Sequence, residues 1–292
     1  MNEFKTYHPI INFIYFLFVI GFSMFFMNPV CLVISFICGF SYSVVLGGKK
    51  AFKTNIVYML PMMLAAALIN PAFNHEGATI IEYLPSGNPL TLESIIYGLF
   101  AALMIVSVIC WFSCFNVVMT SDKIMYLFGR IVPSLSLIFS MTLRFVPKFT
   151  AQFKKVSDAQ RCIGKDSSGG GFIRRIKNGL SILSIMITWA LESSIETADS
   201  MKARGYGLPG RTAFSVFKFK IKDIVVLGAI VVLGAYILVG HFLGTIEFAF
   251  FPLIKGAKIS VFGLSVFIAY FMLMILPVII EVREALRWKS LK

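Results

Sequence analysis

The class of this protein is decided by residues 10–46. They read IINFIYFLFVIGFSMFFM up to Met27, then Asn28-Pro29, then VCLVISFICGFSYSVVL. A membrane-spanning helix needs about 20 mostly apolar residues, and proline does not continue a regular helix. The stretch therefore predicts two transmembrane helices joined by a tight turn at Asn28-Pro29.

The composition of the whole chain agrees with this class. Of its 292 residues, 58% are hydrophobic and 14% are charged, whereas soluble domains average about 45–50% apolar and about 25% charged residues. The 30 phenylalanines and 14 methionines favour lipid-facing or tightly buried helices. Disordered proteins are poor in aromatic residues and rich in charge, so that class is excluded too. We expect an all-α integral membrane protein.

Six apolar segments are candidate spans. The third is short and contains Pro61, which predicts a tilted or broken helix there. We therefore expect about six transmembrane helices, at residues 10–27, 30–46, 56–70, 93–119, 224–241 and 259–280.

The basic residues orient these spans, because the cytoplasmic loops of membrane proteins are enriched in Lys and Arg. The chain holds 27 Lys and Arg against 14 Asp and Glu, a net charge of +13. Residues 120–222 contain 17 of the basic residues, and residues 71–92 contain none. With both termini and residues 120–222 in the cytoplasm, Lys255 and Lys258 are the only two of the 27 basic residues that lie outside. We expect a multi-pass protein of the cell membrane with both termini cytoplasmic.

The segment between the fourth and fifth spans is the most informative part of the chain. It contains two apolar stretches, 135–146 and 180–191, and the first of them is interrupted by Arg144. Apolar runs of about 10–14 residues are more often buried or interfacial than membrane-spanning. A seventh and an eighth span are the alternative.

Each apolar stretch continues into a more polar helix that ends on an arginine and a glycine. The first helix ends near Arg161 and Gly164, and the second near Arg204 and Gly205. Helix capping alone explains either end, because glycine is common just past a helix and arginine interacts favourably with the helix dipole. Two matched ends favour a cytoplasmic or interfacial pair of long helices with charged tips. A helix of about 28 residues, roughly 40 Å long, can act as a lever between a cytoplasmic partner and the membrane.

The second helix end resembles a signature of a known transporter family. Residues 200–207 read SMKARGYG and are similar to the second signature of the transmembrane T component (EcfT/CbiQ-like) of energy-coupling factor (ECF) ABC-type transporters. Residues 158–166, DAQRCIGKD, occupy the place of the first signature. Residues 70–77 and 87–91 also resemble external-loop segments of some members. The resemblance runs from about residue 70 to residue 211 and implies a prokaryotic plasma membrane.

This resemblance implies a mechanism shared among subunits. Two ABC ATPase subunits close on ATP, the tips of two coupling helices sit in grooves on them, and the T component passes the movement to a small substrate-binding membrane (S) subunit. The implied cargo is a vitamin or a transition-metal ion such as cobalt or nickel, and the chain itself is expected to be non-catalytic. The residues implied in ATPase coupling are Gln160, Arg161, Cys162, Ala203, Arg204 and Gly205, and those implied in contact with the substrate-binding subunit are Leu183, Ile187 and Trp189.

The first signature departs from the family pattern. That pattern reads approximately Ala-Gln-x-Ala-Arg-Gly-x-Asp, and without gaps its arginine falls on Ile163, while Arg161 lies two residues earlier. Two residues on a helix correspond to a rotation of about 200°, so Arg161 does not simply replace the family arginine. Either the helix end unwinds and lets Arg161 turn, or the first contact is weaker and Arg204 dominates.

No catalytic or cofactor motif accompanies these features. Residues 205–210 match GxGxxG, but they follow a helix and contain Pro209, so a dinucleotide site is not predicted. No GxxxxGK[ST] motif is present, so ATP hydrolysis is expected on partner subunits. His75 beside Glu76 suits a loop better than a metal site, and the five cysteines form no CxxC pair. We expect no cofactor, no bound metal and no nucleic-acid partner.

Two other transporter classes remain as alternatives. An independent secondary carrier normally has ionisable residues deep within its spans, and the first three expected spans contain no Asp or Glu. A conventional ABC permease carries a Glu-Ala-Ala…Gly coupling loop, which is not found here. We expect N-terminal spans in residues 1–119 (about four), a coupling domain in 120–221 and C-terminal spans in 222–292 (about two).

Overall fold

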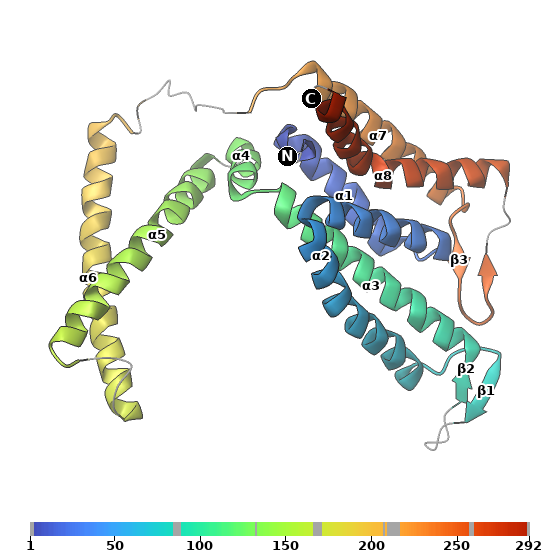
Figure 1. The fold of residues 1–292 in the computed structure, drawn as a ribbon, viewed down its shortest axis with the longest axis horizontal. Helices are drawn as coiled ribbons and strands as arrows, with labels where there is room; N and C mark the ends of the chain where they lie inside the picture. Colours follow the sequence, from blue (N-terminus) through green and yellow to red (C-terminus); the bar gives the residue numbers. More distant parts are fainter. Residues whose placement is uncertain are drawn as a thin grey trace. The chain divides into compact units, whose positions relative to one another are not determined.

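The computed structural model describes residues 3–83, 89–131, 133–165, 171–206, 208, 217–256 and 260–290. The chain divides into two compact units. The membrane unit comprises residues 1–124 and 217–292, and the helix-pair unit comprises residues 125–216. Long α-helices dominate both units (Figure 1), which confirms the expected all-α class.

The membrane unit is a set of long helices with two small hairpins. In one hairpin Ile80 lies opposite Thr91, and in the other Phe248 lies opposite Gly256, both in antiparallel pairing. In chain order the elements are η1 Phe4–Thr6, α1 Pro9–Phe25, α2 Pro29–Phe73, β1 Ile80–Tyr83, β2 Pro89–Thr91, α3 Leu92–Val118, α7 Ile221–Phe242, β3 Phe248–Ala249, β4 Lys255–Gly256 and α8 Val261–Ser290.

The predicted turn at Asn28-Pro29 is confirmed. Helix α1 ends at Phe25 and α2 begins at Pro29. The Asn28 side chain accepts a hydrogen bond from the Val30 N–H at 3.0 Å, and its amide donates to the Ile246 carbonyl at 3.1 Å. Proline is favoured at the first position of a helix, where no N–H partner is lost. Asn28 therefore starts α2 and ties the turn to the segment that follows α7.

Helix α2 contains two of the expected spans, 30–46 and 56–70, and folds back on itself between them. Gly48 interrupts the helix with φ 60° and ψ −149°. The Asn55 amide donates a hydrogen bond to Ser43 Oγ at 2.9 Å across this break. In a straight helix residues 12 apart are separated by about 18 Å. The chain therefore doubles back at Gly48, and the two arms of α2 meet beside this break.

Both arms of α2 pack against α3. Met59 of the second arm is buried with Val106 and Cys110 of α3, and Phe40 of the first arm packs on the same cluster. At Gly98 of α3 an added Cβ would lie 2.9 Å from the backbone oxygen of Ala67. This close approach requires glycine at that position.

Trp111 of α3 lies in the buried core of the membrane unit, which also draws on α1, α2, α7 and α8. Its indole N–H donates to Ser35 Oγ at 3.0 Å. The Ser35 hydroxyl also bonds the hydroxyls of Ser23 at 2.6 Å and Ser107 at 2.8 Å. Polar groups inside a bilayer need partners within the protein, and this network supplies them.

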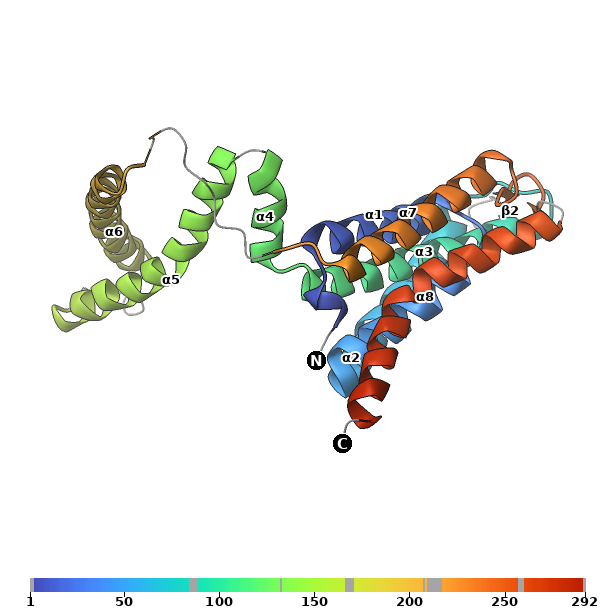
Figure 2. The same ribbon diagram turned by 90° about the horizontal axis from the view of Figure 1, so that it is seen from above.

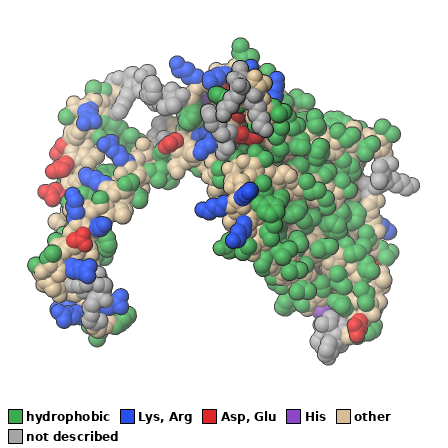
Figure 3. Space-filling view, viewed as in Figure 1, with side chains coloured by type: hydrophobic (Ala, Val, Ile, Leu, Met, Phe, Trp, Pro, Cys, Tyr) green, Lys and Arg blue, Asp and Glu red, His purple; other side chains and the backbone are tan. Residues whose placement is uncertain are grey.

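Four of the described helices, α2, α3, α7 and α8, are long and apolar enough to cross a membrane. Helix α1 is apolar but has only 17 residues. Hydrophobic side chains cover much of the visible face of the membrane unit (Figure 3), as the membrane assignment requires. The expected number of about six spans is not confirmed, because two of those spans lie in the single folded helix α2 and another in the short α1. That number stays a prediction.

The two chain ends lie on the same side of the membrane unit (Figures 1 and 2). The buried Glu281 carboxylate of α8 accepts hydrogen bonds from the backbone N–H groups of Glu3 at 3.0 Å and Phe4 at 3.1 Å. This carboxylate holds η1 against α8. The cytoplasmic location of both ends stays a prediction.

The helix-pair unit contains the two long helices that the sequence predicted. Helix α5 spans Pro133–Cys162 (30 residues) and α6 spans Phe172–Ala203 (32 residues), and α4, Ser121–Ile131, precedes them. Their lengths correspond to roughly 45 Å and 48 Å. Neither α5 nor α6 is among the described helices that meet the length and hydropathy of a membrane span. The alternative of a seventh and an eighth span gains no support.

Candidate functional site

The end of α6 is fixed by a Schellman motif. Arg204 is the C-cap, and Gly205 follows with φ 78°. The Tyr206 N–H donates to the Met201 carbonyl at 3.0 Å, and the Gly205 N–H donates to the Lys202 carbonyl at 2.9 Å. A left-handed residue at this position is usually glycine, because a Cβ is unfavourable there. The local sequence therefore sets where α6 stops and where Arg204 stands.

The end of α5 has the same hydrogen-bond pattern. Gly164 has φ 74°, and its N–H donates to the Arg161 carbonyl at 3.0 Å. The Lys165 N–H donates to the Gln160 carbonyl, also at 3.0 Å. Ile163 is consequently the C-cap of α5.

The shared motif allows the two helix ends to be compared residue by residue. Arg204 of α6 corresponds to Ile163 of α5, and Arg161 corresponds to Lys202. Ile163 is 63% exposed, so the α5 tip presents an apolar side chain where the α6 tip presents a guanidinium. The helix remains regular through Arg161, so the unwinding considered above does not occur.

The expected coupling residues all belong to these two tips. Their side chains come from the last turns of α5 and α6 and differ in exposure. Arg161, Cys162, Ala203 and Arg204 are exposed, and Gln160 and Gly205 are partly buried.

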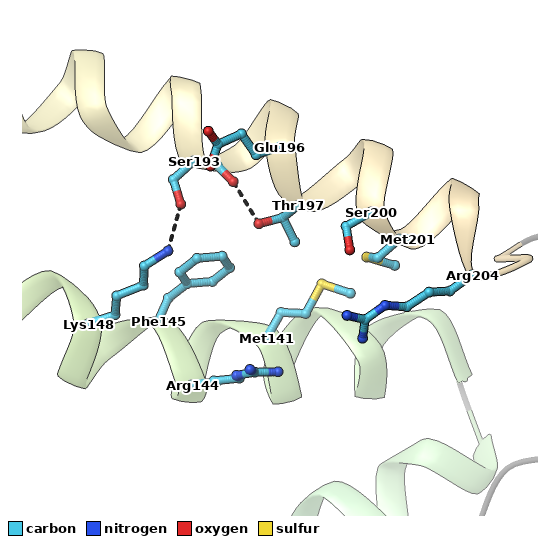
Figure 4. A pocket seen from close by; sticks show the side chains of 10 residues that line it. All are labelled: Met141, Arg144, Phe145, Lys148, Ser193, Glu196, Thr197, Ser200, Met201 and Arg204. Carbon is cyan, nitrogen blue, oxygen red and sulfur yellow. Dashed lines mark hydrogen bonds between the residues drawn. The ribbon is translucent and has the colours of Figure 1, made fainter.

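A cleft of about 610 Å³ lies between α5 and α6 and includes Arg204. Figure 4 shows Arg204 reaching back from the end of α6 towards Met141 of α5. Arg144 and Lys148 line the cleft from α5. The other lining residues are Phe145, Ser193, Glu196, Thr197, Ser200 and Met201.

Trp189 joins the two helices beside this cleft. Its ring meets Phe149 of α5 edge to face at 5.2 Å, and Lys148 Nζ lies over it at 5.3 Å. Lys148 also donates a hydrogen bond to Ser193 Oγ at 2.9 Å. These contacts fix the spacing of α5 and α6 at this level.

An apolar groove of about 620 Å³ also lies between α5 and α6. Leu183 and Ile187 line it and are 53% and 52% exposed. Trp189 is not among its lining residues; it is half-buried, with its ring against Phe149. The structure thus brings two of the three expected subunit-contact residues together and places the third elsewhere. The remaining lining residues are Phe149, Thr150, Phe153, Gly179, Met186 and Ala190.

Sequence reasoning missed the residues that complete the cleft. In the sequence, Arg144 stands out only as an interruption of an apolar stretch. A signal was present, because Arg144 and Lys148 are four residues apart and therefore share one face of α5. Thr197 and Arg204 share one face of α6 in the same way, seven residues apart. Neither spacing shows which face of α5 packs against which face of α6.

No group of three or more His, Cys, Asp or Glu side chains that could hold a metal ion occurs in the part of the chain that the structure describes. All five cysteines are free thiols; Cys162 is exposed and the other four are buried. The chemistry offered by the two tips and the cleft is therefore that of positive charge, hydroxyl groups and exposed apolar surface.

Comparisons with known proteins show which sequences this chain resembles. The family model of CbiQ, described as cobalt transport protein, matches residues 5–216, which include both helix ends. The chain is similar to the energy-coupling factor transporter transmembrane protein EcfT of Lactobacillus helveticus, with 36% identity over 97 residues, 33% of this chain and 35% of that protein. It is also similar to EcfT 1 of Listeria monocytogenes, with 26% identity over 189 residues, 60% of this chain and 70% of that protein.

A protein of Mycoplasma genitalium described as uncharacterized, MG181, is 28% identical over 148 residues, 47% of this chain and 35% of that protein. The chain thus spans only about a third of the length of two of these three relatives.

Proposed function

The chain belongs to the family of the cobalt transport protein CbiQ, and from this premise we propose that it is the transmembrane scaffold subunit of an ECF-type importer. In this role it transmits ATP-driven movement from two partner ATPases to a separate substrate-binding membrane subunit. The cargo would be a vitamin or a transition-metal ion, cobalt or nickel. The observation that carries the proposal is the pair of long helices α5 and α6, whose ends share one capping motif.

The α6 tip is the stronger of the two proposed ATPase contacts. Arg204 is exposed at the C-cap, between Ala203 and Gly205. A guanidinium is permanently charged and forms two parallel hydrogen bonds with a carboxylate, and small neighbours allow close approach of a partner groove. The α5 tip has Ile163 at the matching place, so its contact is proposed to be weaker and more apolar.

The apolar groove is the proposed contact for the substrate-binding subunit. Leu183 and Ile187 are exposed there, in a helix whose tip is polar. A small and very hydrophobic membrane protein is the complementary partner for such a surface. Trp189 supports this groove indirectly, by holding α6 against Phe149.

Hydrolysis of ATP is proposed to take place on the partner subunits, and this chain is proposed to have no catalytic role. The two tips offer a guanidinium and an apolar side chain for docking, in keeping with a mechanical function. The proposed location is the prokaryotic plasma membrane, with both termini in the cytoplasm.

The test is affinity purification of the tagged chain from its native membrane. We expect ATP-binding subunits and a small hydrophobic membrane protein to be recovered with it. Arg204→Ala should lower ATPase recovery at least about tenfold, because loss of one partner of a buried charge pair costs roughly 2–5 kcal/mol. Arg161→Ala should lower it less, and Ile187→Asp should lower recovery of the small membrane protein.

Arg174→Ala is the matched control, because Arg174 lies in the first turn of α6, far from the tip. The Arg174→Ala chain should recover the partner subunits in the same amounts as the unmodified chain. A homo-oligomer without any ATPase would overturn the proposal and favour an independent carrier. Recovery of ATPases without a separate membrane subunit would favour a conventional ABC permease.

A further inference from the structure

The cleft between α5 and α6 concentrates positive charge. Arg144 and Lys148 enter it from α5 and Arg204 enters it from α6, and Glu196 is the single acidic residue among those that line it. Within the described residues neither arginine forms an ion pair, and Lys148 bonds the neutral Ser193 hydroxyl. Three cations and one carboxylate leave the lining with an excess of positive charge, which favours binding of an anion.

Hydroxyl groups of α6 also line the cleft. Ser193, Thr197 and Ser200 line the cleft at spacings that place them on one side of the helix. Ser193 Oγ accepts from Lys148, so its own hydrogen remains able to donate to a ligand. Thr197 donates instead to the Ser193 carbonyl at 2.6 Å and orients that turn.

The apolar lining suits a ligand that also carries carbon atoms. Met141 and Phe145 of α5 and Met201 of α6 lie between the charged groups (Figure 4). The cleft volume of about 610 Å³ lies within the range of small-molecule sites, about 300–1,000 Å³.

We propose that this cleft binds a phosphate group through Arg144 and Arg204, while Lys148, held at Ser193, adds positive charge to the same cleft. A phosphate offers more oxygen atoms than a carboxylate, and it can accept two parallel hydrogen bonds from each guanidinium and one from a hydroxyl at the same time. Its negative charge offsets the excess of three cations over one carboxylate among the lining residues. The phosphate belongs either to an anionic phospholipid headgroup or to free phosphate in the cytoplasm.

This proposal goes beyond the proposed function. It shares Arg204 with the proposed ATPase contact, whereas Arg144 and Lys148 belong to the cleft alone. Arg144 and Lys148 lie 14 residues or more before the α5 end at Cys162, a distance of about 20 Å or more along the helix. A change at Arg144 therefore leaves the α5 tip in place, and the cap of α6 consists of backbone hydrogen bonds that do not involve Arg144.

The experiment uses the full chain in a neutral detergent. One arm measures binding of radiolabelled inorganic phosphate by equilibrium dialysis. The other counts retained dioleoylphosphatidylglycerol by native mass spectrometry. Zwitterionic dioleoylphosphatidylcholine, whose phosphate is balanced by the choline cation, is the comparison. Binding in the first arm alone identifies free phosphate, binding in the second alone identifies a lipid headgroup, and binding in both supports the shared phosphate chemistry.

Arg144→Gln and Arg204→Gln should each weaken the observed binding about tenfold or more, because each removes a bidentate charged contact. Arg144→Lys should weaken it less, since it keeps the charge and loses only the planar fork. Lys154→Gln on α5 and Arg174→Gln on α6 remove basic residues outside the cleft and should change the Kd less than about twofold.

ATPase recovery is measured on the same Arg144→Gln sample, so that failure of the phosphate site and failure of the coupling role are seen separately. Absence of binding in both arms would overturn the proposal. So would binding that Arg144→Gln, Arg144→Lys and Arg204→Gln leave unchanged while the proteins elute as the unmodified chain does. Arg144→Lys guards against misfolding, because it conserves the size and charge of the side chain.

Discussion

Lys123 shows how a single residue couples the start of α4 to the N-terminal segment. Its side chain is 4% exposed, and its ammonium donates to the Lys5 carbonyl. With its amide oxygen turned towards Lys123, Asn12 accepts a second hydrogen bond at 2.6 Å. Burial, and then the positive charge of Lys5, lower the pKa of Lys123 to about 8.

This pKa predicts a rise of stability with pH. Between about pH 8 and pH 10.4 the unfolded chain binds a proton at Lys123 that the folded chain has lost, so the unfolding free energy increases through that window. The Lys123→Met variant lacks this pH-dependent contribution to the unfolding free energy. The difference in unfolding free energy, wild type minus variant, should grow by about 1–3 kcal/mol from pH 7 to pH 10. Thermal unfolding in detergent measures it, with the exposed Lys50→Met as control; a constant difference would contradict the prediction.

At the scale of elements, the two arms of α2 depend on one glycine. Gly48 has φ 60° and ψ −149°, a combination that is essentially confined to glycine. Gly48→Ala should strain the break by about 1–3 kcal/mol. The unfolding temperature of the purified protein should fall by roughly 2–8 °C.

Gly21→Ala is the control for this change. Gly21 lies within α1, and nothing lies within 4 Å of an added Cβ there. Alanine favours a helix over glycine, so this variant should be as stable as the unmodified chain or slightly more stable. Equal unfolding temperatures for Gly48→Ala and the unmodified chain would show that the fold-back does not depend on the conformation at Gly48.

At the scale of the whole molecule, native Cys162 can report the orientation in the membrane. It is the exposed cysteine of the five, at the end of α5, and the others are buried. An impermeant maleimide should label it in inside-out vesicles and leave it unlabelled in intact cells. Glu82→Cys in the exposed strand β1, made together with Cys162→Ala, should give the opposite pattern. Labelling of Cys162 in intact cells would reverse the proposed orientation.

Local rules were sufficient for several features of this chain. The apolar runs gave the membrane class, because a bilayer demands long apolar helices. Asn28-Pro29 gave the turn between α1 and α2, since capping and proline act over two or three residues. Gly164 and Gly205 gave the ends of α5 and α6, since a left-handed residue stops a helix wherever it occurs. The different places of Arg161 and Arg204 relative to the glycine that ends each helix were also visible in the sequence.

Only the tertiary structure decided which side chains meet. The contact of Ser43 with Asn55 depends on how far the chain turns at Gly48, and Trp189 lies against Phe149 because of how α5 and α6 pack. The cleft unites Arg144 with Arg204, 60 positions apart. A helical spacing determines which residues share a face, but the partner of that face is set by packing between distant segments. The sequence alone therefore determined the membrane class, the turn at Asn28-Pro29 and the ends of α5 and α6. The tertiary structure determined the fold-back of α2, the groove and the cleft.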